Sequence, residues 1–139
     1  MIVVDTNVVS ELSRVRPAPE VLSWYAEQRA GDLFLSVVSA AEMLAGVLCM
    51  TPGARRDVVE RGVVDALETQ FAGRVLAFGA ATALEYAGVV RLRTRLGRPI
   101  ATADAMIAAT ALATGASLAT RNVRDFEGVG LEVIDPWSA

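Results

Sequence analysis

The chain has 139 residues, a net charge of −3, and 53% hydrophobic against 21% charged residues. This length and composition predict one domain with a dense core and exclude wholesale disorder. All 13 basic residues are arginine, and the chain has no His, no Lys and a single cysteine, Cys49. These absences exclude histidine-activated nucleophiles, Schiff-base chemistry, lysine-containing phosphate loops and zinc cages. Any enzymatic chemistry must come from carboxylates, which favour hard metal ions.

The amino terminus and the longest uncharged stretch bear on where the protein works. The amino terminus has no basic leader and reaches Asp5 at once, unlike a signal peptide. Residues 105–120 carry no charge but include glycine, serine and threonine, and they are too few and too polar to cross a bilayer. We therefore expect a cytoplasmic protein without a membrane segment.

Short apolar runs alternate with helical patterns along the chain. In chain order, we expect a strand at 2–5, helices at 6–13 and 19–30, a strand at 33–36, helices at 39–48 and 54–71, a strand at 74–78, helices at 80–96 and 102–115, and strands at 117–120 and 131–134. Apolar strands that alternate with helices favour an α/β fold with a parallel sheet covered on both faces.

Acidic residues occur where these elements meet. Asp5 ends the first strand, Glu42 lies in the first turn of the helix after the second, and Asp104 lies in the first turn of the helix before the fourth. Asn122 and Asp125 directly follow the fourth strand. The carboxyl ends of parallel strands meet at one edge, so we expect these oxygens to converge there. Such a group suits Mg²⁺ or Mn²⁺, because three carboxylates repel one another unless a cation lies among them.

Each acid also has a purely structural alternative. Asp5 can cap the helix that follows it, and Glu42 can complete a capping box with Ser39. Asp104 can complement a helix dipole, and Asp125 can be a solvated turn residue. Thr6 and Thr120 can be ordinary capping or strand-end residues. Composition and spacing by themselves therefore support an acidic edge that is a candidate metal site.

Four segments, in order along the chain, resemble motifs of PIN-domain ribonucleases and, among these, of VapC-type toxins of toxin–antitoxin pairs. They are 2–11 (IVVDTNVVSE), 36–47 (SVVSAAEMLAGV), 100–111 (IATADAMIAATA) and 119–126 (ATRNVRDF), the last followed by Pro136 and Trp137. The resemblance covers the whole chain, whose length resembles the FitB-like branch. It implies one PIN domain over residues 1–139, with a central parallel sheet of about five strands and helices on both faces.

The resemblance assigns catalytic and metal-binding roles to Asp5, Glu42 and Asp104, with Asp5 and Asp104 as direct ligands and Glu42 either as a direct ligand or acting through water. It places Thr6 and Thr120 as supporting hydroxyls that orient the acids. The fourth acidic position of the family falls on Asn122, which brings an oxygen without a charge. Asp125 lies three residues later and is the alternative for that role.

The activity implied by the resemblance is hydrolysis of phosphodiester bonds in single-stranded or looped RNA, with Mg²⁺ or Mn²⁺ as the cofactor. The implied partners are a cognate antitoxin that neutralises the toxin, and promoter DNA bound only through that antitoxin. The resemblance also implies a homodimer or a toxin–antitoxin hetero-oligomer. The competing hypothesis is a PIN-like regulatory module that binds nucleic acid with its antitoxin and does not cleave it.

A group of arginines offers a candidate RNA contact away from the acids. Arg91, Arg95 and Arg98 fall at helical spacing and can follow the phosphates of a bound strand. The alternative is a solvated basic helix face.

Overall fold

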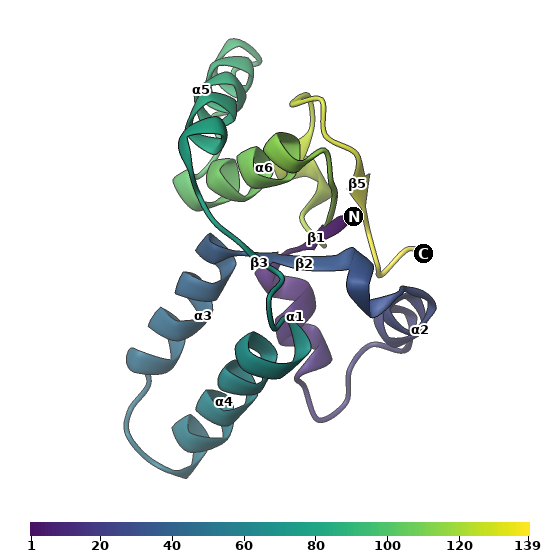
Figure 1. Cartoon of the computed structure of the whole chain (residues 1–139), viewed down its shortest axis with the longest axis vertical. Coiled ribbons are helices and arrows are strands. Elements are labelled where there is room, and N and C mark those ends of the chain that lie inside the picture. The colour runs from purple at the N-terminus through teal and green to yellow at the C-terminus, as the bar shows by residue number, and fades with distance from the viewer.

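The computed structural model describes residues 1–139 and consists of a five-stranded parallel sheet with helices on both faces (Figure 1). The strands are β1 (Ile2–Val4), β2 (Leu33–Ser36), β3 (Val75–Leu76), β4 (Ser117–Ala119) and β5 (Val133–Ile134). The helices are α1 (Thr6–Leu12), α2 (Pro19–Glu27), α3 (Val37–Leu48), α4 (Ala54–Asp65), α5 (Ala80–Arg95) and α6 (Thr102–Thr114), with short helical segments at Ala30–Asp32, Ala66–Gln70 and Val123–Phe126. The predicted fold class is confirmed.

The order of the strands changes direction once, at the central strand β1. The order is β3-β2-β1-β4-β5, and β1 pairs in parallel with both β2 and β4. The chain builds outward from β1 through β2 to β3, and then returns to place β4 on the other side of β1. The crevice beyond the ends of β1 and β4 is therefore the topological switch point, where open parallel sheets bind their ligands.

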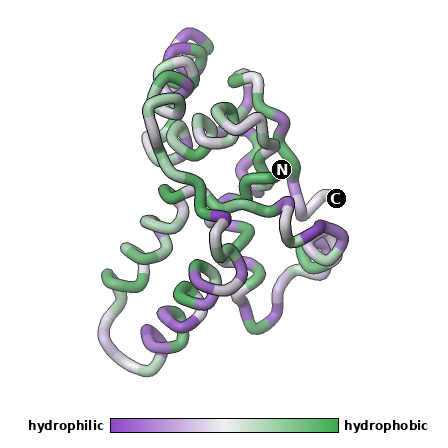
Figure 2. Tube along the Cα trace, viewed as in Figure 1, coloured by the Kyte–Doolittle hydropathy of each residue, from purple (hydrophilic) through white to green (hydrophobic).

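The sheet separates two hydrophobic layers, as the alternation of residues in β1 illustrates. Val4 packs into the layer under α1, α2 and α3, whereas Val3 packs into the layer under α5 and α6. Both valines are fully buried. Figure 1 shows the two groups of helices on opposite sides of the sheet, and Figure 2 shows that hydrophobic residues predominate along the central strands. This layering fixes the strand ends from which the polar side chains project.

Several element boundaries differ from the predicted ones. Helix α3 begins at Val37 rather than at 39, because the hydroxyl of Ser36 accepts the Val38 amide at 3.0 Å and caps the helix. The predicted helix 54–71 is α-helical only to Asp65 and then widens into a π-helical turn ending at the buried Phe71. The outer strands β3 and β5 have only two residues each, since each pairs on one side only.

None of the helices combines the length and the apolar composition that crossing a membrane requires.

Candidate functional site

Three acids predicted from the sequence line one polar cleft at the switch point. Asp5, Glu42 and Asp104 face a cleft of about 540 Å³ that contains no hydrophobic side chain. Asp5 is the residue after β1, Glu42 lies in the second turn of α3, and Asp104 lies in the first turn of α6. The cleft therefore gathers carboxylates from three elements that lie far apart in the sequence.

Asp5 is the anchored member of the group. Its side chain is 5% exposed, and its Oδ1 accepts the Thr6 amide at 2.7 Å. Its Oδ2 accepts the Thr120 hydroxyl at 2.7 Å and the Asn7 side-chain amide at 3.0 Å. Burial raises the pKa of Asp5, and these three donors oppose that rise. The carboxylate is consequently fixed in one orientation without an ion pair.

Thr120 is the centre of this hydrogen-bond network. Its buried hydroxyl donates to Asp5 and accepts from the Asn7 side chain and from the Asn122 backbone amide, both at 3.1 Å. The network joins the end of β1 to the end of β4 and holds the loop that follows β4. Thr6 extends it to the third element, since its hydroxyl donates to Glu42 Oε1 at 3.1 Å.

The structure excludes a capping role for Glu42. The cap of α3 is Ser36, and the hydroxyl of Ser39 is buried without a hydrogen-bond partner. Glu42 therefore completes no capping box with Ser39. Its exposed side chain instead lies beside the cleft and accepts the Thr6 hydroxyl.

The pKa of Asp104 is raised by its surroundings in the cleft. Its pKa is raised to about 6, chiefly by burial and then by the negative charges of Asp5, Asp125 and Glu42. No basic side chain forms an ion pair with Asp104. The two ion pairs of the chain are Arg14–Glu11 and Arg98–Glu127. A cation placed in the cleft would relieve this repulsion.

The two candidates for the fourth acidic position lie in different places. Asn122 lines the cleft, whereas Asp125 belongs to the short helical turn Val123–Phe126 and does not line it. The charge of Asp125 nevertheless reaches the cleft, since it raises the pKa values of both Asp5 and Asp104.

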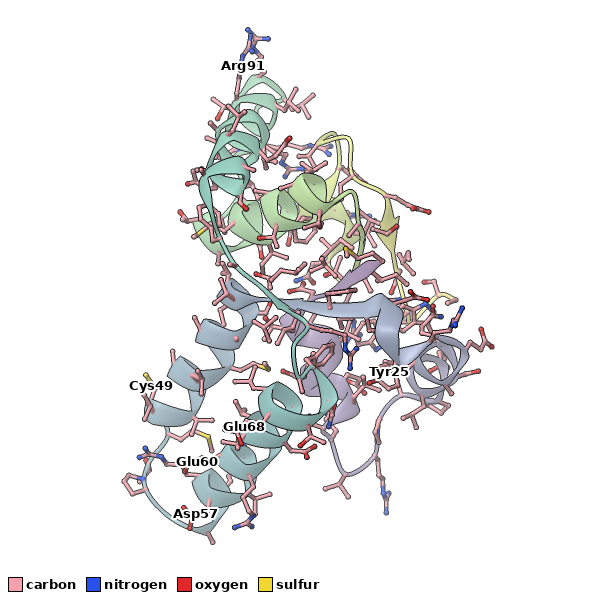
Figure 3. The ribbon with its side chains drawn as sticks, viewed as in Figure 1. Tyr25, Cys49, Asp57, Glu60, Glu68 and Arg91 are labelled. Atoms are coloured by element: carbon pink, nitrogen blue, oxygen red, sulfur yellow. The ribbon has the colours of Figure 1, made fainter.

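The arginines at 91, 95 and 98 lie outside this cleft. All three are exposed, and Arg98 donates to Glu127 at 2.9 Å. Arg91 lies at the tip of α5 and points away from the rest of the molecule (Figure 3). Their contact with RNA stays a prediction.

Four lining residues were not predicted from the sequence: Asn7, Ser10, Glu11 and Arg14. They follow Asp5 along α1, on or just beyond the same helix. Their spacing in the sequence could have identified them, because residues three and four apart share one face of a helix.

The donor set of the cleft fits a hard divalent cation. Its lining offers carboxylate, amide and hydroxyl oxygens, the ligands that Mg²⁺ and Mn²⁺ prefer. No three acidic or Cys side chains lie close enough together to share one ion. Asp5 is fixed, but Glu42 is exposed and Asp104 is half-buried, so both can change rotamer toward it.

The chain is similar to a known protein family and to several of its members. The model of the PIN domain matches residues 2–130. The plasmid stability protein StbB of Pseudomonas syringae pv. tomato is 42% identical, with each chain covered completely. The VapC ribonuclease Y4jK of Sinorhizobium fredii is 39% identical over 99% of this chain and 98% of its own length. The toxin FitB of Neisseria gonorrhoeae is 34% identical over 99% of both chains.

Solved structures agree with this comparison. The structure of FitAcB from Neisseria gonorrhoeae superimposes with a TM-score of 0.92 at 34% identity, with both chains covered completely. A structure of FitAB bound to the IR36 DNA fragment gives a TM-score of 0.91 at 35% identity, covering 99% of this chain and 96% of the other. The family model, these relatives and these structures together show that the chain belongs to the PIN-domain family.

Proposed function

We propose that this chain is a Mg²⁺- or Mn²⁺-dependent endoribonuclease and the toxin of a toxin–antitoxin pair. The main support is the cleft that Asp5, Glu42 and Asp104 all line, none of them in an ion pair. Relatives named as a VapC ribonuclease and as toxin FitB support the activity and its biological role. A module that only binds nucleic acid has no need for an uncompensated acidic cluster, which argues against the non-cleaving alternative.

The three acids would hold the metal ion, with Asp5 as the fixed ligand and Asp104 and Glu42 closing around it. Bound there, the ion would lower the pKa of a water molecule and stabilise charge on the scissile phosphate. Three donors keep the Asp5 carboxylate oriented. Asn7 and Thr120 donate to its Oδ2, and the Thr6 amide donates to its Oδ1. Thr6 also orients Glu42 through its hydroxyl. Asn122 adds a neutral side chain to the wall of the cleft.

A second cavity supports a protein partner, the antitoxin. A groove of about 460 Å³ between α1, α3 and α4 adjoins the acidic cleft, with which it shares Thr6, Ser10 and Glu42. Most of its lining is hydrophobic, and Val58 and Val59 on α4 are exposed at 60% and 38%. An apolar peptide segment seated here would reach the acids directly. We propose that promoter DNA is bound through that partner, in line with the structure of FitAB on DNA.

The proposal extends to the cellular location and the oligomeric state of the protein. We propose that the protein acts in the cytoplasm, where its RNA substrate lies. We also expect a homodimer or a hetero-oligomer with the antitoxin. Leu44 and Leu48 on α3 are 44% and 70% exposed and give such an assembly an apolar surface. Sedimentation of the purified protein tests this expectation.

The proposed activity is tested by cleavage of total RNA with the purified chain, free of antitoxin. The reaction is run with Mg²⁺, with Mn²⁺ and with EDTA, beside the variant Asp104→Asn. We expect fragments that need the metal and disappear in the variant. Intact RNA under every metal condition, with a folded protein, would contradict the ribonuclease proposal and favour the non-cleaving module.

A further inference from the structure

Arg14 is the one basic residue that lines the acidic cleft. Its Nη1 donates to Glu11 Oε2 at 3.1 Å, and its side chain is 67% exposed. Glu11 is buried, and its other oxygen accepts the Ala18 backbone amide at 2.8 Å. Glu11 is therefore held by the loop between α1 and α2, and in turn it holds Arg14 beside the cleft.

A second arginine, Arg121, is anchored next to the site without lining the cleft. Arg121 directly follows Thr120, and its backbone amide donates to Asn7 Oδ1 at 3.3 Å. Its guanidinium lies over the ring of Trp137, with Cζ at 5.2 Å from the ring centre. The Ala18 amide and Arg14 lower the pKa of Glu11, and the charge of Arg121 adds to this effect. Arg14 and Arg121 thus both lie near Glu11.

An RNA-cleaving site made of three carboxylates has an electrostatic difficulty. Its substrate is a chain of phosphates, which the carboxylates repel. A guanidinium has five N–H donors in a planar fork that fits phosphate oxygens, and Glu11 occupies only one donor of Arg14. Arg121 forms no ion pair with any carboxylate of the chain, so its charge is available to a ligand.

We propose that Arg14 and Arg121 bind the phosphates of single-stranded RNA and guide the strand into the acidic cleft. We call this pair the arginine rim. Glu11 and Trp137 are its positioning residues, since one holds the Arg14 guanidinium and the other lies against that of Arg121. The inference rests on the ribonuclease function proposed above and adds the substrate-binding side of the same site.

The test measures binding of a short fluorescein-labelled single-stranded RNA of mixed sequence by fluorescence anisotropy. EDTA is present, so that no cleavage occurs, and the full chain is used with Arg14→Gln, Arg121→Gln and the double substitution. The matched control is Arg61→Gln, an exposed arginine on α4 that does not line the acidic cleft. Thermal unfolding by circular dichroism verifies that each variant is folded.

Each rim substitution is expected to weaken RNA binding roughly three- to tenfold at low salt, and the double substitution more. The slope of log affinity against log salt concentration should become shallower by about 0.7 for each phosphate that the variant no longer neutralises. The control should change neither quantity. A weakening caused only by altered structure would not reduce the salt slope in these steps.

Unchanged affinity and an unchanged salt slope in the double variant would overturn the arginine rim and leave these arginines to a protein partner. Cleavage of total RNA by the wild-type chain is measured in parallel. Cleavage with normal binding by the variants refutes only the rim. Absence of cleavage under every metal condition refutes the ribonuclease, while the binding assay still decides the rim.

Discussion

Thr120 donates a hydrogen bond of 2.7 Å to Asp5 and joins the ends of β1 and β4 across 115 residues of sequence. Both side chains are buried at the switch point of the sheet. A buried carboxylate without a cation is costly, and here three hydrogen-bond donors offset part of that cost. The position of Asp5 in the cleft therefore depends on a residue from the opposite end of the chain.

The substitution Thr120→Val tests this dependence, because valine keeps the shape of threonine and removes the hydroxyl. We expect the free energy of unfolding at neutral pH to fall by about 1–3 kcal/mol, since the Asp5 carboxylate loses a buried donor. RNA cleavage should fall about 10- to 100-fold, as for other residues that orient metal ligands. Urea unfolding and the cleavage assay measure the two effects. Thr120→Ser keeps the hydroxyl and should resemble the wild type; wild-type behaviour of the valine variant would contradict the prediction.

The sequence was sufficient to predict the parallel sheet and the acids at its edge, because apolar runs locate strands and strand ends locate sites. It did not predict the role of Asn7, whose side chain donates to both Asp5 and Thr120. Such a role depends on contacts between segments distant in sequence, which periodicity does not contain. The cap of α3 was also misassigned, since Ser36 and Ser39 are both capping residue types and only the backbone geometry distinguishes them.

Ser36, which precedes α3, and Ser39, which lies in its first turn, provide a direct test of the cap. Ser36→Ala removes the bond to the Val38 amide and should lower the free energy of unfolding by about 1 kcal/mol. Ser39→Ala removes a buried hydroxyl that has no partner, so stability should stay equal or increase. Urea unfolding of both variants gives the comparison. A larger loss of stability for Ser39→Ala than for Ser36→Ala would show that the assigned cap is wrong.

The pKa of Asp104 predicts a pH dependence of stability in the metal-free protein. Its pKa is raised to about 6 from an ordinary value of 3.8, so the folded chain binds more protons than the unfolded chain between these values. The contribution of Asp104 to stability is therefore fully present at low pH and is lost as pH rises through about 6.

Urea unfolding between about pH 4 and pH 7 in EDTA measures this contribution as the difference between the wild type and Asp104→Asn. The wild type should lose stability relative to the variant as pH increases across this window. The lowered pKa of Glu11 acts in the opposite direction at low pH, but Glu11 is present in both proteins and cancels in the difference. A constant difference across the window would contradict the raised pKa.

Metal binding should stabilise the fold independently of any RNA. Mn²⁺ at about a hundredfold excess over its dissociation constant should add about 2.7 kcal/mol to the free energy of unfolding. The gain should be greatly reduced in Asp104→Asn. Asp57→Asn is the control, because Asp57 is an exposed carboxylate on α4, outside the acidic cleft (Figure 3). Equal stabilisation of all three proteins would show that the ion binds elsewhere.

The two candidates for the fourth acidic position, Asn122 and Asp125, lie at different distances from the cleft. Asn122 lines the cleft, whereas Asp125 acts on it only through its charge. Asn122→Asp should therefore add a carboxylate within reach of the ion and tighten Mn²⁺ binding, measured by calorimetry. Without metal it should raise the pKa of Asp104 further and destabilise the protein at neutral pH, because four carboxylates then repel one another.

Asp125→Asn should have the opposite effect on the metal-free protein. Removing its charge relieves Asp5 and Asp104, so stability at neutral pH should increase while RNA cleavage is retained. If Asp125→Asn abolishes cleavage and Asn122→Ala does not, Asp125 serves the fourth position. The short helical turn Val123–Phe126 would then have to move toward the cleft when the ion binds, since Asp125 does not line it in this structure.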